Sequence, residues 1–385
     1  MHYELFSTHS KLPLFATSER RFETKQRPHR FMSTDAKGQG AVALRFEPDL
    51  STKQKKGAHK PLFAEVFTQK SVKAKANTHI HLLVNPFSGK KKGKDIGEQV
   101  KLQLEKEGKN VDIYFSDYSG HLIEIAQGID ASADDIFAVV GGDGSLSEVI
   151  TGRMKAHPNG GGVFALIPAG TGNSMAHDLR LNSTEQAVQC IIRGARQNLD
   201  LAKVEMVSGL PGSENGQTVR YSHNLVTWGL GVDSTIKAEK MRWMGPMRYD
   251  VGILMAIMAN NRRQATLTID DIQMEDDYTL FLIQNSQTGG SMLPLAPGAS
   301  LDDGMMDIGI LKKMTRRDVL KAFGMLKKEG RHVFHPRVDY HRFKTLSITT
   351  PAPAAINVDG ENIGSTPLSM EVLPGAVQIC VPPSE

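Results

Sequence analysis

The sequence predicts an α/β fold with two parts: an N-terminal Rossmann-like α/β domain and a C-terminal domain of the antiparallel β-sandwich type. Two observations predict it. From residue 79, short β-rich runs alternate with polar or helical stretches, as in a parallel sheet covered by helices on both faces. After about residue 200, many short strand-like runs follow one another with turn residues between them, as in an antiparallel sandwich.

Four strands are expected in the first part, and three of them end in a glycine-bearing loop. They are HIHLLVNP (79–86), VDIYFS (111–116), DIFAVVGG (135–142) and GVFALIPAG (162–170). Helices are expected at 146–156, where apolar residues share a face, and at 184–195, where Ser183 and Gln186 form a capping box. Because ligands bind beyond the carboxyl ends of such strands, the three loops should line one site.

The second part is expected to be mostly β. The strand-like runs are QATLTID (264–270), YTLFLIQN (278–285), MMDIGILK (305–312), TLSITT (345–350), AINVDG (355–360), LSMEVLPG (368–375) and VQICVPP (377–383). Helical segments near 248–261 and 315–329 interrupt them. The predicted domains are therefore residues 76–200 and 201–385, preceded by an arm of residues 1–75.

Composition excludes several classes of protein. A chain of 385 residues with 40% hydrophobic and 23% charged residues is typical of a soluble two-domain protein. Its longest uninterrupted apolar stretch, 251–259, is much shorter than the roughly 20 residues of a membrane-spanning helix. Residues 1–78 carry 15 Lys and Arg against 7 Asp and Glu, so the remainder is net acidic. With no nucleic-acid-reading module visible, a nucleic-acid binder is disfavoured.

The basic arm (1–75) lacks apolar periodicity and is predicted to be disordered and to touch anionic lipid. An organelle address is the alternative, which Glu4, Glu19 and Glu23 weaken. We therefore expect a cytoplasmic protein with peripheral membrane association, with organelle targeting by the arm as the other interpretation.

Each glycine-rich loop has residues that suit phosphate binding. NPFSGKKKG (85–93) offers backbone amides and lysines without the spacing of a Walker A loop. GGDG (141–144) is glycine-rich but holds a carboxylate, and IPAGTGNS (167–174) allows close backbone approach. Any one of these is often a plain turn, but three at successive strand ends indicate a site. No G-x-G-x-x-G opens a helix, which disfavours a dinucleotide oxidoreductase.

Together these loops resemble a known catalytic domain. NPFSGKKKG, GGDGSLSEVITG (141–152) and IPAGTGNSMAHDL (167–179), in that order, resemble the domain shared by diacylglycerol, ceramide and sphingosine (long-chain base) kinases. WGLGVDSTIKAEKMRWMGPMRYDVG (228–252) and GRHVFHP (330–336) are similar to the sphingosine and ceramide kinase branch, and LAPGASLDDGMMDIGIL (295–311) and VDGE (358–361) are further family motifs. The resemblance implies a kinase that uses ATP and Mg²⁺ and holds a lipid tail in its C-terminal domain.

The resemblance also implies roles for individual residues. Asp143 is the candidate general base that takes the proton from the lipid's primary hydroxyl, and Glu361 competes for that role. Glu148 suits either catalysis or the dipole of its helix. The implied nucleotide contacts are Asn85, Pro86, Ser88, Gly89, Ser116, Gly141, Gly142, Gly144, Gly170, Thr171, Gly172, Asn173, Arg242, Arg248 and Asp359.

Asp233 and Thr235 are the expected substrate contacts. Sphingosine kinases place an aspartate where this chain has Thr235, and ceramide kinases also lack that aspartate. The expected substrate is a long-chain base, with ceramide and then diacylglycerol as alternatives. A non-catalytic lipid-binding protein of the same fold is the alternative of another class. No metal ligands are assigned by the sequence.

Overall fold

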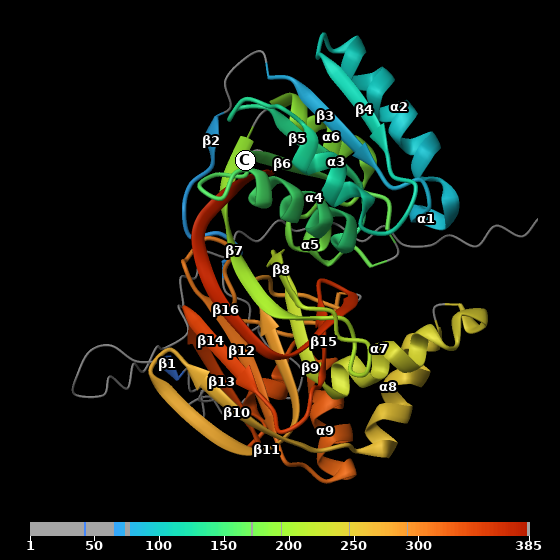
Figure 1. Cartoon of the computed structure of the whole chain (residues 1–385). Helices are drawn as coiled ribbons and strands as arrows, with labels where there is room; N and C mark the ends of the chain where they lie inside the picture. Colours follow the sequence, from blue (N-terminus) through green and yellow to red (C-terminus); the bar gives the residue numbers. More distant parts are fainter. Residues whose placement is uncertain are drawn as a thin grey trace, which may run out of the picture. The chain divides into compact units, whose positions relative to one another are not determined.

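The first part of the chain folds into a parallel sheet of order β4–β3–β5–β6 (Figure 1). The computed structural model describes residues 42–43, 65–73, 78–170, 172–193, 195–245, 247–290 and 292–382. The strands of this sheet are β3 (Ile80–Val84), β4 (Val111–Phe115), β5 (Ile136–Gly141) and β6 (Val163–Pro168). β3 and β5 are buried along their whole length, as expected of strands covered on both faces.

Helices connect these strands. They are α1 (Ser88–Lys91), α2 (Gly93–Lys106), α3 (His121–Gly128), α4 (Asp143–Ala156), α5 (Ser174–Asp178) and α6 (Thr184–Arg193). α3 packs against α4, and α2 contacts α6. The helices predicted at 146–156 and 184–195 are confirmed as α4 and α6, although α4 begins three residues earlier, at Asp143.

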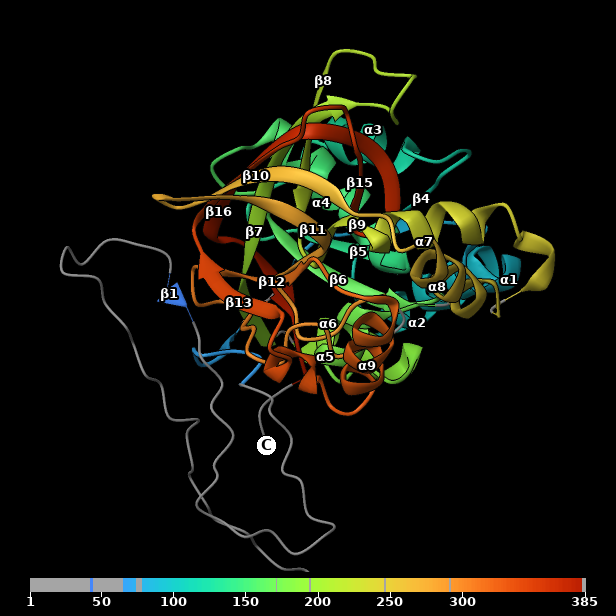
Figure 2. The ribbon, with the colours of Figure 1, turned by 90° about the horizontal axis from the view of Figure 1, so that it is seen from below.

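The second part is mostly antiparallel, as predicted. Its elements are β7 (Ala195–Ser208), β8 (Gln217–Ser222), β9 (Leu225–Gly229), α7 (Leu230–Glu239), η1 (Arg242–Met244), α8 (Met247–Ala259), β10 (Arg263–Ile269), β11 (Ile272–Gln284), β12 (Met306–Lys312), α9 (Arg316–Leu326), η2 (Arg331–Phe334), β13 (Val338–Phe343), β14 (Thr345–Thr349), β15 (Ala355–Val358) and β16 (Glu361–Cys380). α8 contacts α9 (Figure 2), and an apolar cluster lies between these helices and strands β11 and β12.

Two long strands, β7 and β16, belong to both parts of the fold. They pair antiparallel along most of their length (Figure 1). β16 then pairs in parallel with β6 through Gln378 and Ile379, and its last residues pack in the core of the first sheet. The predicted domain boundary at residue 200 falls inside β7.

The prediction of a disordered arm over 1–75 is wrong for residues 65–73. The Val66 carbonyl accepts a hydrogen bond from the Leu301 amide (2.8 Å), and the Thr68 amide donates to Asp302 (2.6 Å). β2 (Val72–Lys73) pairs with β7, and β1 (Val42–Ala43) pairs with β13. The rest of the predicted arm lies outside the described residues. Among the residues described, no helix is long and apolar enough to cross a membrane.

Candidate active site

The three predicted loops meet at the carboxyl edge of the parallel sheet. Asn85 Nδ2 donates to Ser145 Oγ, 3.2 Å away, which joins the first loop to α4. A Cβ on Gly170 would lie only 2.8 Å from the Cα of Gly142, so the second and third loops touch where neither residue has a side chain. Gly89 has φ +58° and lies against the backbone just before Gly170. These contacts bring the loops into one site.

The loops open into a cavity of about 740 Å³. The predicted nucleotide contacts that line it are Asn85, Ser88, Gly89, Ser116, Gly142, Gly144, Gly170, Gly172 and Asp359. Pro86, Gly141 and Asn173 do not line it. Gly141 is the last residue of β5, and its carbonyl accepts from the amides that follow β6; Asn173 Nδ2 donates to the Gly170 carbonyl (2.9 Å). These two therefore shape the loops. Thr171 lies outside the described residues.

Asp143 lies in the cavity wall and is held there by the start of α5. Its carboxylate accepts hydrogen bonds from the amides of Ser174 (2.9 Å) and Met175 (3.1 Å). These bonds satisfy helix amides that have no partner within α5. Burial raises the pKa of Asp143, and the charge of nearby His223 opposes that rise. The carboxylate is fixed in orientation while its remaining lone pairs are left to face the cavity.

Glu361 and Glu148 form a carboxyl pair in the cavity wall, next to the second loop. Asp359 and Gly360, both with positive φ, make the two-residue turn between β15 and β16, which sets Glu361 at the start of β16. A Cβ on Gly144 would lie 3.8 Å from Glu361 Oε1. Burial and the hydrogen-bonded neighbour Glu148 raise the pKa of Glu361 to about 7. Each of two neighbouring carboxylates disfavours the ionisation of the other.

Asp359 stabilises a turn next to the cavity. Its carboxylate accepts from the Ser222 hydroxyl (2.9 Å) and from the amides of Asn224 (3.1 Å) and Leu225 (2.8 Å), which fixes the turn between β8 and β9. His223 Nδ1 lies 3.3 Å from the same carboxylate. Burial would raise the pKa of Asp359, but His223 and these hydrogen bonds outweigh it, so the pKa lies below its ordinary value.

Of the two predicted substrate contacts, one lines the cavity and the other does not. Thr235 lines the cavity, and its hydroxyl lies 2.9 Å from both the Val232 carbonyl and Asn362 Oδ1. Asp233 does not line it, because its carboxylate pairs with Arg263 (2.7 Å) and accepts from Asn261 (3.2 Å). The prediction that Asp233 contacts the substrate is therefore not supported by its position.

The two predicted phosphate-binding arginines lie between α7 and the start of α8. Arg248 does not line the cavity, and the side chain of Arg242 lies outside the described part of the chain. The cavity wall does hold one lysine, Lys90, from the first loop. Contact of Arg242 and Arg248 with the phosphates stays a prediction.

The cavity continues from the polar loops into an apolar space between the strands and the helix layer. Its apolar lining residues come from β9, β11 and β12 and from helices α7, α8 and α9: Leu225, Leu230, Ile253, Ile257, Leu280, Leu282, Leu311, Val319, Ala322, Phe323 and Leu326. Leu293 and Leu295, from the connection between β11 and β12, add to this wall. One continuous cavity thus has a polar, acidic end and an apolar end.

Comparison with known proteins agrees with this architecture. The family model described as the diacylglycerol kinase catalytic domain matches residues 79–204, and the one described as the YegS C-terminal NAD kinase beta sandwich-like domain matches residues 224–381. The chain belongs to the diacylglycerol kinase catalytic-domain superfamily. We class it as a lipid kinase of that family, for which ATP is the phosphoryl donor.

Individual relatives carry different substrate names. Sphingosine kinase 1 of Arabidopsis thaliana is 27% identical over 83% of this chain and 72% of its own length. A diacylglycerol kinase of Staphylococcus saprophyticus is also 27% identical, over 78% of this chain and 94% of its own length. A crystal structure of a diacylglycerol kinase from Bacillus anthracis aligns with a TM-score of 0.60 at 20% identity, over 80% of this chain and 98% of that one, which shows the shared fold.

Sequence reasoning missed two features of the site. His223 is fully buried beside Asp359, and no sequence motif marked it. The pairing of Glu148 with Glu361 joins residues far apart in the chain. Two sequence features relate to that contact. The Asp-Gly pair before Glu361 indicates a hairpin turn, and Glu148 lies in a predicted helix.

Proposed function

We propose that the protein transfers the γ-phosphoryl group of ATP to the primary hydroxyl of a sphingoid lipid, with a long-chain base as the preferred substrate. The observation that carries the proposal is the single cavity that joins the phosphate-type loops and Asp143 to an apolar space. A nucleotide at the polar end and an acyl or alkyl chain at the apolar end would bring the hydroxyl to the carboxylates between them.

The acidic wall favours a long-chain base over the neutral alternatives. Asp143, Glu148 and Glu361 line the cavity, and a headgroup held between the nucleotide and the lipid chain would lie near them. A protonated amine gains from such carboxylates, whereas the amide of ceramide and the esters of diacylglycerol do not. Thr235 adds a hydroxyl to the wall of the same cavity.

The chemistry requires one proton acceptor and charge compensation. The lipid oxygen forms a bond to the γ-phosphorus, the bond from that phosphorus to the bridging oxygen of ADP breaks, and the hydroxyl proton moves to a carboxylate. Both Asp143 and Glu361 are candidates for this proton acceptor. Asp143 is held in position by hydrogen bonds, whereas Glu361 has a pKa of about 7, which suits a base at neutral pH. The carboxylate oxygens of Asp143, Glu148 and Glu361 are donors that Mg²⁺ prefers. When held by these carboxylates, Mg²⁺ would supply positive charge that offsets the charge of the phosphate groups.

The decisive experiment supplies ATP and Mg²⁺ with a long-chain base, ceramide or diacylglycerol in mixed micelles. We expect phosphorylated long-chain base as the main product, and a loss of about 10²–10⁴-fold in kcat for Asp143→Asn. Asp271→Asn, at an exposed turn, is the matched control and should retain activity. No product from any of the three lipids would refute the kinase proposal, and a preference for diacylglycerol would refute the choice of substrate.

We further propose that the enzyme reaches its substrate by peripheral membrane contact through α8. Met247, Leu254, Met255 and Met258 on α8 are exposed, and Trp243 of η1 is 85% exposed beside them. The same helix lines the apolar end of the cavity with Ile253 and Ile257. An exposed apolar helix face of this kind suits insertion at the lipid–water interface.

Vesicle co-sedimentation tests the membrane contact. Leu254→Asp with Met258→Asp should weaken binding to anionic vesicles at least tenfold. Leu102→Asp on α2 is the control, because Leu102 is equally exposed (59%) but lies on the first part of the fold. Equal binding by the α8 variant and the control would contradict the proposal. A cytoplasmic location with membrane contact is the corresponding expectation in cells.

A further inference from the structure

We propose that His79, His81 and Asp112 form a binding site for a divalent transition-metal ion of the Zn²⁺ type, at the amino end of the parallel sheet. β3 begins beside this cluster and ends at the loops of the candidate active site, so the two sites lie at opposite edges of the sheet. The inference concerns a second site and does not depend on the proposed kinase activity.

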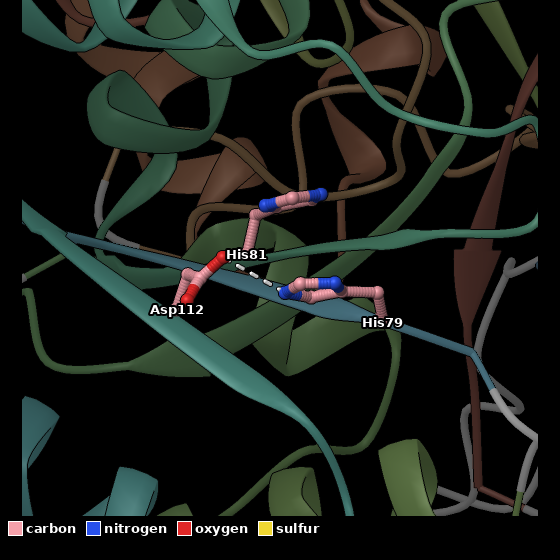
Figure 3. A group of neighbouring side chains, drawn as sticks. All are labelled: His79, His81 and Asp112. Carbon is pink, nitrogen blue, oxygen red and sulfur yellow. Dashed lines mark ion pairs between the residues drawn. The ribbon is translucent and has the colours of Figure 1, made fainter.

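The strand geometry brings the three side chains together. His79 and His81 are two residues apart at the start of β3, so their side chains project from the same face of the sheet. The parallel register sets Asp112 of β4 opposite His81. Figure 3 shows the three side chains gathered beside β3 and β4, with His79 Nε2 2.9 Å from Asp112 Oδ2. The two imidazole rings stack with their centroids 4.6 Å apart.

These distances fit a single ion. One nitrogen of each histidine and one oxygen of Asp112 all lie within 4.8 Å of one another. Ligands bound to Zn²⁺ at about 2.0–2.2 Å are separated by somewhat less than this, so small side-chain movements would complete the coordination. Two imidazoles and one carboxylate are also a ligand set that leaves a further coordination position open.

The environment of His81 indicates that its imidazole ring lacks a binding partner. Its side chain is buried, and neither ring nitrogen has a hydrogen-bond partner among the described residues. A neutral imidazole has one nitrogen lone pair that it can offer to a metal ion. Asp135 Oδ2 lies 3.7 Å from His81 Nε2, where a carboxylate can orient the ring as outer-shell groups do in metal sites.

The surroundings are acidic and open. A cavity of about 490 Å³ adjoins the cluster, and its wall carries Asp112, Glu124, Asp130 and Asp135 but no lysine or arginine among its described lining residues. Such a wall attracts cations and leaves room for a water or a small anionic ligand on the ion. Imidazole ligands favour Zn²⁺ and similar ions over Mg²⁺, which prefers oxygen donors.

Zinc titration of the full chain without an affinity tag, after treatment with a chelator, tests the inference. We expect one Zn²⁺ per chain by calorimetry, binding at least tenfold weaker in His79→Gln and in Asp112→Asn, and no competition from millimolar Mg²⁺. Both variants change side chains that are 30% and 54% exposed, so folding should be preserved, which circular dichroism checks. His157→Gln, at an exposed position after α4, is the matched control.

A second readout is thermal stability, because an ion that binds only the folded chain raises the unfolding midpoint. Zinc should raise it in the wild type and in His157→Gln but not in His79→Gln. The absence of one-to-one binding to the wild type, or binding by His79→Gln equal to that of His157→Gln, would overturn the inference. Neither ATP nor lipid is used, so the result stands apart from the test of kinase activity.

Discussion

Replacing Glu361 by glutamine should stabilise the fold at alkaline pH while impairing catalysis. Folding raises the pKa of Glu361 from 4.5 to about 7, because the carboxyl is buried beside Glu148. Between these two values the folded chain keeps a proton that the unfolded chain loses. The contribution of this residue to the free energy of unfolding is therefore full below pH 4.5 and falls as the pH rises through 7.

The magnitude follows from the two pKa values. Their difference corresponds to about 3 kcal/mol, which is the most that Glu361 subtracts from stability above pH 7. Glutamine has the same shape and can donate a hydrogen bond to Glu148 without carrying a titrating group. At pH 8 we therefore expect Glu361→Gln to be up to about 3 kcal/mol more stable than the wild type, and at pH 4.5 to be nearly equal to it.

Urea unfolding followed by far-UV circular dichroism at pH 4.5 and pH 8 measures this difference, provided that the slope with denaturant is unchanged. Glu107→Gln, at an exposed position just after α2, is the matched control and should shift stability equally at both pH values. The reasoning is refuted if Glu361→Gln gains no stability at pH 8, or gains as much at pH 4.5. The same variant should lose activity if Glu361 accepts the lipid proton.

Three further predictions test other parts of the structure. Ala322→Trp, at the apolar end of the cavity, should raise KM for the lipid at least tenfold with little change in KM for ATP; an unchanged lipid KM in steady-state assays would count against a lipid in that space. His223→Gln removes the charge that lowers the pKa of Asp143, so the acid limb of the pH–rate profile should move to higher pH, and an unmoved profile would exclude this coupling. Gly152→Ala places a Cβ 2.3 Å from the Ile123 carbonyl, where α4 packs on α3, and should cost about 1–3 kcal/mol in urea unfolding; a stability equal to wild type would contradict this close packing.

The parts of the fold that local patterns control could be predicted from the sequence. The strands β5 and β6 are apolar runs, and β3 is apolar except for His81. Each is followed by glycine-bearing residues, so the meeting of their loops followed from the general geometry of parallel sheets. Asp143 could be identified because its motif is contiguous. Its capping of α5 could not, because that contact depends on how the second and third loops pack.

Elements with buried polar residues were harder to predict. β7 was not recognised as a strand, since Gln197, Asn198 and Asp200 interrupt its apolar pattern although most of it is buried. Asp200 is 1% exposed because it accepts hydrogen bonds from the amides of Gly304 and Gly375, both at 2.6 Å. Those partners lie more than a hundred residues away in sequence. The Glu148–Glu361 pair and the placement of Asp233 depend on tertiary contacts of the same kind.

We expect the path of β16 to set where the protein can flex. One uninterrupted strand begins at Glu361 in the wall of the candidate active site and ends as a partner of β6, so a single strand connects the two parts of the fold. Its pairing with β7 is irregular at two places, between Ser365 and Leu368 and between Leu373 and Val377. We expect any opening that admits a nucleotide to occur at those irregular points. Motion at the second would change the distance between Glu361 and the phosphate loops without breaking the strand.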